Sequence, residues 1–533
     1  MRSNTHFTKR ALLSLMLVIA MLFGMSACGG GYKNPDDQLH KMEAAWFSDH
    51  ADEILSVYAD ARDQLSEAKQ AAKGTVTFTV GDPLINLLRS QIPYDLSFIK
   101  DVSFDIESAI QDTKTLTSLA LKLAGTKLVS VDLFADASAG TAAISLGDLA
   151  DNWLSINADD MDIDYDEGFS DIISIFMDAA DKLPTKKVLS SILNHYYGIF
   201  LENINGVVKA EGTLTADGIA VECTTLTVNI TERMLYEATK DVLTAVIADK
   251  DIKEIFTSLN KAVGSTLYEN LGVSLDVAYS SMIDSASYAL ENMNSADVAN
   301  YITDDVLFTV VDYVKGDEII GRSISSPNAD EFALFYGKAS TKDGNGYELT
   351  ANIDYTTIKI KGEGTEKKGA LTGEFDLIID GTAFAFIKLE GFNVDALLDG
   401  TPKGTITVSP GAGLWDAISG SSDSSVTSIL GSAFALRAQF DCSDDEAKIS
   451  LDVLNGSDVY VGIKIDASKE KAGKISAPKK VTDDAEAWAS TINVSKLISN
   501  IEKTKYVSDI NDILEGTLGV TLDDIKSFFE GNN

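Results

Sequence analysis

The sequence predicts an α+β fold of curved antiparallel β-sheets with helices packed on one face, organised as two lobes. Runs of alternating apolar and polar residues, such as 347–355, are typical of strands with one buried and one solvated face. Asp-Gly and Asn-Gly pairs between such runs are typical of tight hairpin turns. Amphipathic helical stretches supply the expected cover, at residues 170–202, 231–263, 265–317 and 494–530.

The first helix is expected over residues 39–73, a stretch rich in Ala, Glu, Lys and Leu whose apolar residues recur at helical spacing. Alternation over residues 76–80 then predicts a strand. This strand passes directly into a helix at Asp82-Pro83, with Asp82 as the N-cap and Pro83 at the first helical position.

The same order of strand and helix returns twice. Residues 225–230 alternate, and Thr231 is placed to cap the helix that follows. A third copy is expected at residues 490–503. The spacing of the three copies is too irregular for a solenoid.

Hairpins dominate the second half. The apolar phase shifts after Tyr355 to Ile358 and Ile360, which predicts a bulge near Thr357. Turns are predicted at three pairs, which are Asp217-Gly218, Asp380-Gly381 and Asn455-Gly456. The apolar stripes of these strands are expected to be buried beneath helices, including Phe375, Leu451 and Ile463.

A chain of 533 residues is longer than one ordinary domain. We expect a helix-rich α+β lobe over residues 39–317 and a hairpin-rich lobe with C-terminal helices over residues 318–533. The boundary is placed where apparently helical text gives way to a polar loop and then to strands.

The N-terminus reads as an export signal. Arg2, Lys9 and Arg10 are followed by an apolar run over residues 11–27 that ends in small residues. The run has 17 residues, whereas a permanent transmembrane helix needs about 20. The segment is therefore expected to be cleaved rather than to span a membrane.

The end of this run, Met25-Ser26-Ala27-Cys28, precedes three glycines and resembles the lipobox of bacterial lipoproteins, although Met25 stands where Leu is usual. The resemblance implies that residues 1–27 are a signal peptide, that Cys28 carries acyl chains such as palmitate, and that residues 28–38 form a lipidated Gly-rich tether. The chain is similar to the large acidic lipoproteins of Gram-positive anaerobes. The alternative is an ordinary signal peptide cut near Ala27, with Cys28 a bystander.

The chain carries 81 acidic and 44 basic side chains, a formal net charge of −37. Such a surface repels nucleic acid and anionic headgroups, so no nucleic-acid partner is expected. The acids are spread along the chain without a long run. We interpret them as a solubilising surface.

Catalytic signatures are missing from the sequence. No G-x-S-x-G, H-E-x-x-H, P-loop or dinucleotide fingerprint occurs. His40 and His50 are expected to be exposed on the first helix, and His195 to be packed beside Tyr196. We therefore expect no enzyme and no cofactor.

The cysteines beyond Cys28 are Cys223 and Cys442, too few for a disulfide framework. We expect two separate buried thiols, with a disulfide between them as the alternative.

The strongest metal candidate is the acidic segment at 159–168. Asp160, Asp162 and Asp164 have the spacing that opens an EF-hand loop. The sixth position is Tyr165 instead of the Gly that the turn requires. We expect no tight calcium site there; the alternative is a polar edge with Met161 turned inward.

These features predict an extracytoplasmic lipoprotein, anchored to the cell membrane by its N-terminal lipid. The expected function is binding or carriage of an apolar ligand, because the predicted architecture loosely resembles that of lipoprotein carriers. The alternative is a surface structural or interaction protein without a small-molecule ligand.

Cys28→Ala is expected to release the protein from membranes or to leave it unprocessed, because the variant offers no thiol for acylation. Membrane fractionation and the mass of the mature chain measure this. A variant that fractionates and matures like the wild type would contradict the anchor.

Overall fold

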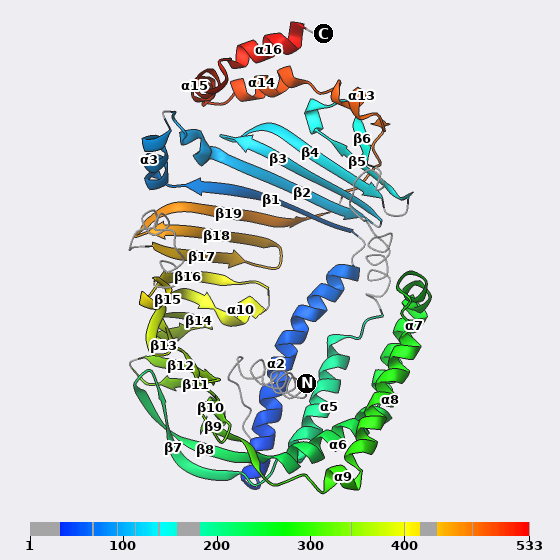
Figure 1. Cartoon of the computed structure of the whole chain (residues 1–533), viewed down its shortest axis with the longest axis vertical. Helices are drawn as coiled ribbons and strands as arrows, with labels where there is room; N and C mark the ends of the chain where they lie inside the picture. The colour runs from blue at the N-terminus through cyan, green and yellow to red at the C-terminus, as the bar shows by residue number, and fades with distance from the viewer. Residues whose placement is uncertain are drawn as a thin grey trace. The chain divides into compact units, whose positions relative to one another are not determined.

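The computed structural model describes residues 32–531 apart from residues 67–68, 93, 112, 137–138, 157–181, 343, 399, 416–433 and 472. The signal segment, Cys28 and the acidic segment with Asp160, Asp162 and Asp164 lie outside the described residues. The structure is mixed α and β, and its strands pair antiparallel apart from the short parallel pair of β20 (Val481–Thr482) with β6 (Trp153–Ile156) in the described ladders (Figure 1).

The chain forms two compact units, which interleave in sequence. Unit 1 comprises the described residues within Met1–Ser66, Ile173–Leu389 and Pro410–Ala417. Unit 2 comprises those within Glu67–Ile172, Glu390–Ser409 and Ile418–Asn533. The boundary expected at 317 and 318 falls within unit 1.

Unit 1 combines a strand meander with long helices. Its helices are α2 (Pro35–Ser66), α5 (Lys186–Glu202), α6 (Glu232–Ala248), α7 (Lys250–Leu271), α8 (Leu275–Met293) and α9 (Ala296–Ala299). Its strands are β7 (Val208–Ala216), β8 (Ile219–Thr231), β9 (Val306–Lys315), β10 (Glu318–Ser325), β11 (Phe332–Ser340), β12 (Asn345–Ile353), β13 (Thr356–Lys367), β14 (Ala370–Ile379) and the first part of β15 (Thr382–Asn393).

Strands β7 to β14 pair in sequence order, each with the next. One face of this sheet packs on α2, where Leu39 and Met42 join Leu226, Val228 and Val310 in a buried cluster. The sheet also curls until β7 packs against β11. Strand β7 also meets β12 closely, because a Cβ added at Gly346 of β12 would lie 2.2 Å from the Ala216 carbonyl oxygen of β7.

Unit 2 is a longer meander with short helices. Its strands are β1 (Lys69–Val80), β2 (Val102–Gln111), β3 (Lys114–Leu123), β4 (Thr126–Asp136), β5 (Thr141–Ser145), β6, β16 (Lys403–Pro410), β17 (Phe434–Cys442), β18 (Glu446–Asn455), β19 (Asp458–Glu470) and β20. Its helices are α3 (Asp82–Gln91), α10 (Val394–Leu398), α13 (Ala485–Ala489), α14 (Val494–Glu502), α15 (Val507–Leu518) and α16 (Leu522–Gly531), with the 3-10 helices η1 (Ser97–Asp101) and η3 (Gly147–Leu149).

The sheet of unit 2 runs from β16 through β17, β18 and β19 to β1, and onward through β2, β3, β4, β5 and β6 to β20. Strand β1 joins its two halves, because it pairs with β19 on one side and β2 on the other. Residues distant in sequence therefore share one sheet.

The hairpin predictions are confirmed. Asp217-Gly218 and Asp380-Gly381 have positive φ at both residues, as type I′ turns require. The third hairpin turns one residue later than predicted, because Asn455 pairs with Asp458 and leaves Gly456 and Ser457 in the loop.

The bulge expected near Thr357 is wrong. Ile353 pairs directly with Thr356, and Asp354 and Tyr355 form a two-residue turn with φ of 48° and 67°. Across this two-residue turn, odd-numbered residues of β12 pair with even-numbered residues of β13, as Ala351 does with Ile358. The apolar residues therefore change from odd to even positions because the chain turns into a hairpin.

Three boundaries differ from the prediction. The last part of the helix expected at 265–317 is strand β9, in which Val310 and Val314 turn to the core because alternate residues of a strand share a face. The helix expected to end at residue 73 ends at Ser66, and β1 begins at Lys69. No strand precedes α14 in the described residues 490–493, although the strand and helix at Thr231 are confirmed.

Tyr355→Gly is expected to raise the free energy of unfolding of unit 1 by about 1 kcal/mol, because a non-glycine residue at positive φ is strained. The Tyr355 side chain is exposed and loses little packing. Gly381→Ala, at a φ of 78°, should have the opposite effect. Denaturant unfolding measures both, and a destabilised Tyr355→Gly would contradict the strain.

Candidate functional site

The cross-strand register of unit 2 gathers its apolar stripes on one face. Ile463 of β19 pairs with Leu451 of β18 and with Phe78 of β1. Residues directly opposite one another in a ladder point to the same face. The same pairing continues into β2, β3 and β4, where Ile106 lies opposite Leu119 and Leu119 opposite Val131.

We call this surface the apolar face. Its central residues are Leu436, Ile449, Leu451, Ile463, Ile465, Val76, Phe78, Phe104, Ile106, Leu119, Val131 and Leu133.

The apolar face is open to solvent along several strands. Leu451 is 48% exposed, Leu436 49% and Leu133 43%, while Ile463 is 36% exposed. Single exposed apolar residues are ordinary, but a contiguous apolar surface marks a binding surface. The expectation that helices bury Leu451 and Ile463 is therefore wrong. In unit 1, Phe375 is buried beside Tyr347, whereas Ile353 and Ile358 are exposed.

On the other face of β4, η3 and α14 cover the strand. Phe134 and Ser130 are buried on that face, whereas Leu133, which points to the apolar face, is exposed. The 3-10 helix η3 approaches Ser130 at Gly147, and α14 contacts both β4 and η3. Asn500 of α14 donates a hydrogen bond to the Leu128 carbonyl oxygen (3.2 Å).

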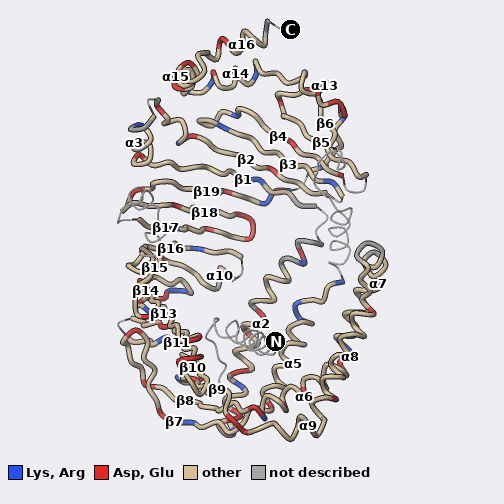
Figure 2. The backbone as a smooth tube through the Cα atoms, in the orientation of Figure 1, with Lys and Arg blue, Asp and Glu red and all other residues tan. Residues whose placement is uncertain are grey.

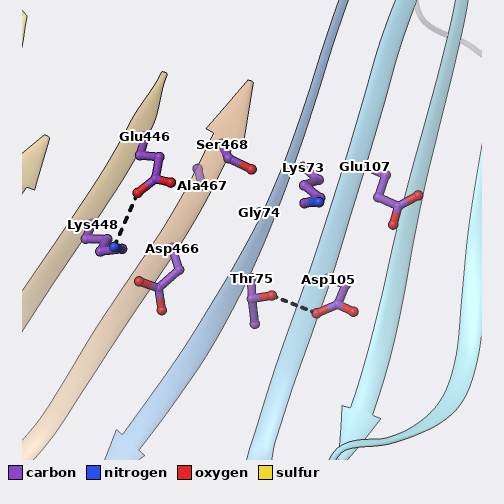
Figure 3. Close-up of a pocket in the computed structure, with 10 residues that line it drawn as sticks. All are labelled: Lys73, Gly74, Thr75, Asp105, Glu107, Glu446, Lys448, Asp466, Ala467 and Ser468. Atoms are coloured by element: carbon purple, nitrogen blue, oxygen red, sulfur yellow. Dashed lines mark hydrogen bonds and ion pairs between the residues drawn. The ribbon is translucent and has the colours of Figure 1, made fainter. Parts of the chain in front are cut away.

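The opposite face of the central strands is charged. A hollow of about 330 Å³ lies over β18, β19, β1 and β2, and Figure 3 shows the side chains around it. Thr75 Oγ1 donates to Asp105 Oδ1 (2.9 Å), and Lys448 pairs with Glu446 (3.3 Å). Burial raises the pKa of Asp105, but the hydrogen bonds from Lys122 and Thr75 outweigh it and the pKa is lowered.

This hollow is a solvated surface rather than a metal centre. Its lysines are paired with neighbouring acids, as Lys73 is with Glu470. In the part of the chain that the structure describes, no group of three His, Cys, Asp or Glu side chains could hold a metal ion. Charges of both signs are distributed over each unit (Figure 2).

A second polar cluster is buried in unit 1. Arg322 of β10 donates from Nε to Asp312 Oδ1 of β9 (2.6 Å) and from Nη2 to Glu43 Oε1 of α2. Tyr197 of α5 donates to Glu43 Oε2 (2.9 Å). The Arg322 guanidinium also lies over the Trp46 ring, 4.9 Å from its centroid. Two carboxylates thus share one buried guanidinium.

Sequence reasoning missed this cluster, although a signal for it exists. In β9, Asp312 occupies the core phase of Phe308, Val310 and Val314, where a charge requires a partner. That partner, Arg322, follows in the next strand.

The histidines are placed differently from the expectation. His50 is buried, with Nδ1 2.5 Å from the Trp46 carbonyl oxygen. His40 is partly buried, with Nε2 2.6 Å from the Ile204 carbonyl oxygen. His195 is exposed beside Tyr196. The expectations of exposed His40 and His50 and of a packed His195 are wrong.

The cysteines are free thiols, as predicted. Cys442 of β17 is buried, and Cys223 of β8 is half-buried. Burial raises the pKa of the Cys223 thiol, which disfavours the nucleophilic thiolate form.

None of the described helices is long and apolar enough to cross a membrane. No protein-family model matches the chain. No curated protein and no solved structure is significantly similar to it.

Ile463→Ala is expected to cost about 1 kcal/mol of unfolding free energy, because its side chain is already partly in water. Leu454→Ala in the neighbouring strand β18 should cost about 2–5 kcal/mol, since Leu454 is buried. Denaturant unfolding of unit 2 measures the difference. Equal losses at both positions would show that the apolar face is covered in solution.

Proposed function

We propose that the protein is an extracytoplasmic lipoprotein, anchored to the cell membrane through Cys28, that binds a lipid with long acyl chains on the apolar face of unit 2. The observation that carries the proposal is the open apolar face itself. Water contact of this face costs roughly 25 cal/mol per Å² of apolar area. A hydrocarbon ligand would remove that cost.

The chemistry of the face favours hydrocarbon over a polar ligand. Its central side chains are aliphatic or aromatic, and the charged residues of the same strands, such as Lys464, Asp466 and Asp105, alternate to the other face. A polar ligand would lose hydrogen bonds to water without finding donors or acceptors. Acyl chains make no hydrogen bonds to water and therefore lose none on binding.

The proposed anchor suits this activity. A lipidated Cys28 would hold the chain at a membrane, which is the source of acyl chains. The acidic surface, with a formal charge of −37, would keep the folded body from adhering to anionic headgroups. The protein would then bind lipids through the apolar face rather than lie flat on the bilayer.

We also propose that the two units act as two lobes, each with helices packed on one face of its sheet. Packing of α2 on the sheet of unit 1 and of α14 on β4 in unit 2 supports this arrangement. We propose no catalytic activity, no cofactor and no metal.

A surface interaction protein is the second candidate. The helices α7 to α9 of unit 1 and the turn beyond α9 expose Tyr268, Tyr288 and Tyr301, of which Tyr301 is 81% exposed. Tyrosine is enriched at protein interfaces. These residues would supply a partner surface that does not involve the apolar face.

The purified protein is expected to carry co-purifying lipid and to bind a fluorescent fatty acid. Leu451→Glu and Ile463→Glu should weaken fatty-acid binding about tenfold or more, because each places a charge in the apolar face. Thr77→Glu is the matched control, because Thr77 pairs with Lys464 on the opposite face.

Organic extraction with mass spectrometry and fluorescence titration measure these effects, and circular dichroism checks the fold. Lipid-free protein with an intact fold would contradict carriage and favour the interaction protein. Equal fatty-acid binding by all variants would show that the ligand lies elsewhere.

A further inference from the structure

Helix α2 meets the sheet of unit 1 through a mainly apolar stripe with one carboxylate in its centre. Leu39, Met42 and Trp46 are buried on this stripe, and Glu43 is buried between them. A buried carboxylate is strongly disfavoured as an ion unless it is paired and hydrogen-bonded. The partners of Glu43 therefore decide how firmly α2 packs.

The groups that face Glu43 come from every element packed around it. They are Arg322 of β10, Asp312 of β9, Tyr197 of α5 and, beside Arg322, Tyr336 of β11. On α2 itself, Trp46 and His50 follow one and two turns after Glu43. Among these groups one guanidinium faces two carboxylates. With both acids ionised, the site would carry a net buried charge of minus one.

One acceptor of the cluster lacks a hydrogen-bond donor. Asp312 Oδ2 is buried and, among the described residues, no donor reaches it. Arg322 already donates to Asp312 Oδ1 and to Glu43. Glu43 and Asp312 accept from neighbouring nitrogens of this one guanidinium, Nη2 and Nε, which brings the two carboxyl groups together. A proton on Glu43 would therefore give Asp312 the donor that it lacks and would leave the cluster neutral.

We propose that Glu43 is a buried proton-binding site that holds α2 on the sheet of unit 1, with the neutral carboxyl donating to Asp312. Loss of this proton to water would leave two carboxylates for one guanidinium and would release α2. The helix follows the N-terminal tether, so its release would free the segment nearest the membrane. That last consequence rests on the proposed anchor, whereas the proton site does not.

The direction of the pH dependence follows from Glu43. Burial raises its pKa from 4.5 to about 8, Arg322 opposes the rise and Asp312 adds to it. A folded-state pKa above the unfolded value means that stability is fully present below the unfolded pKa and is lost as the pH rises through the folded pKa. Docking of α2 should therefore weaken steadily as the pH rises from the ordinary pKa of 4.5 to about 8, and it should change little above about 8.

The two tyrosines and the guanidinium around Glu43 do not titrate in this range, so they cannot imitate its pH dependence. Burial raises the pKa of Tyr336 to about 12 and that of Tyr197 well above its ordinary value. The carboxylates of Asp312 and Glu43 hold the pKa of Arg322 well above its ordinary value against the effect of burial.

Hydrogen exchange of the full chain tests the proposal. Protection factors for residues 35–66, corrected for the intrinsic pH dependence of exchange, should fall about tenfold per pH unit between about pH 5 and about pH 8 and level off above about pH 8. Helix α14 of unit 2 serves as the internal reference. In E43Q the fall should disappear, because Gln can donate to Asp312 but cannot ionise.

E202Q is the matched control, since Glu202 is exposed at the end of α5 and should leave the profile unchanged. If E43Q does not fold, the wild-type profile alone decides, because its slope counts the protons released on opening. A wild-type profile that stays flat between about pH 5 and about pH 8, or the same fall in E43Q, would overturn the proposal.

Discussion

Antiparallel pairing fixes the faces of both sheets, and most of the structure depends on what covers the apolar one. Residues opposite one another in a ladder point the same way, so the stripe of each strand joins its neighbours into one continuous surface. Apolar surface in water is costly in proportion to its area. The two units differ in how much of this apolar surface is buried.

In unit 1, helix α2 and the curl of the sheet cover a large part of the sheet's apolar surface. Helix α2 contributes Leu39 and Met42 to the cluster with Leu226 and Val310, and the curl of the sheet buries Leu214 in a second cluster. The cover includes the charged group of Glu43, Asp312 and Arg322. Such a buried group adds little net stability. Removal of one partner is strongly destabilising, because it leaves a buried charge unpaired, so the group fixes the position in which α2 packs.

In unit 2, η3 and α14 contact the opposite face at β4, and residues of the apolar face on the central strands stay partly exposed. This arrangement explains why the same alternation has different meanings in the two units. Phe375 of unit 1 is buried, whereas Leu451 of unit 2 is exposed. The charged face carries paired lysines and acids that keep it in water.

Much of the fold follows from local sequence. Alternation predicted the strands, Asp217-Gly218 and Asp380-Gly381 predicted turns because these residue types adopt positive φ, and Thr231 predicted a helix start because its hydroxyl accepts from the Met234 N–H. Strand β9 was mistaken for a helix because a short, largely apolar run fits both periods until its partners are known.

The sites could not be predicted in the same way. Period-two alternation determines that Leu451 and Ile463 share a face, but whether a layer covers that face depends on where distant helices pack. The meeting of Glu43, Asp312 and Arg322 likewise depends on α2 packing against strands hundreds of residues away. Local interactions thus determined strands, turns and caps, and only long-range packing decided which apolar surface became core and which stayed open.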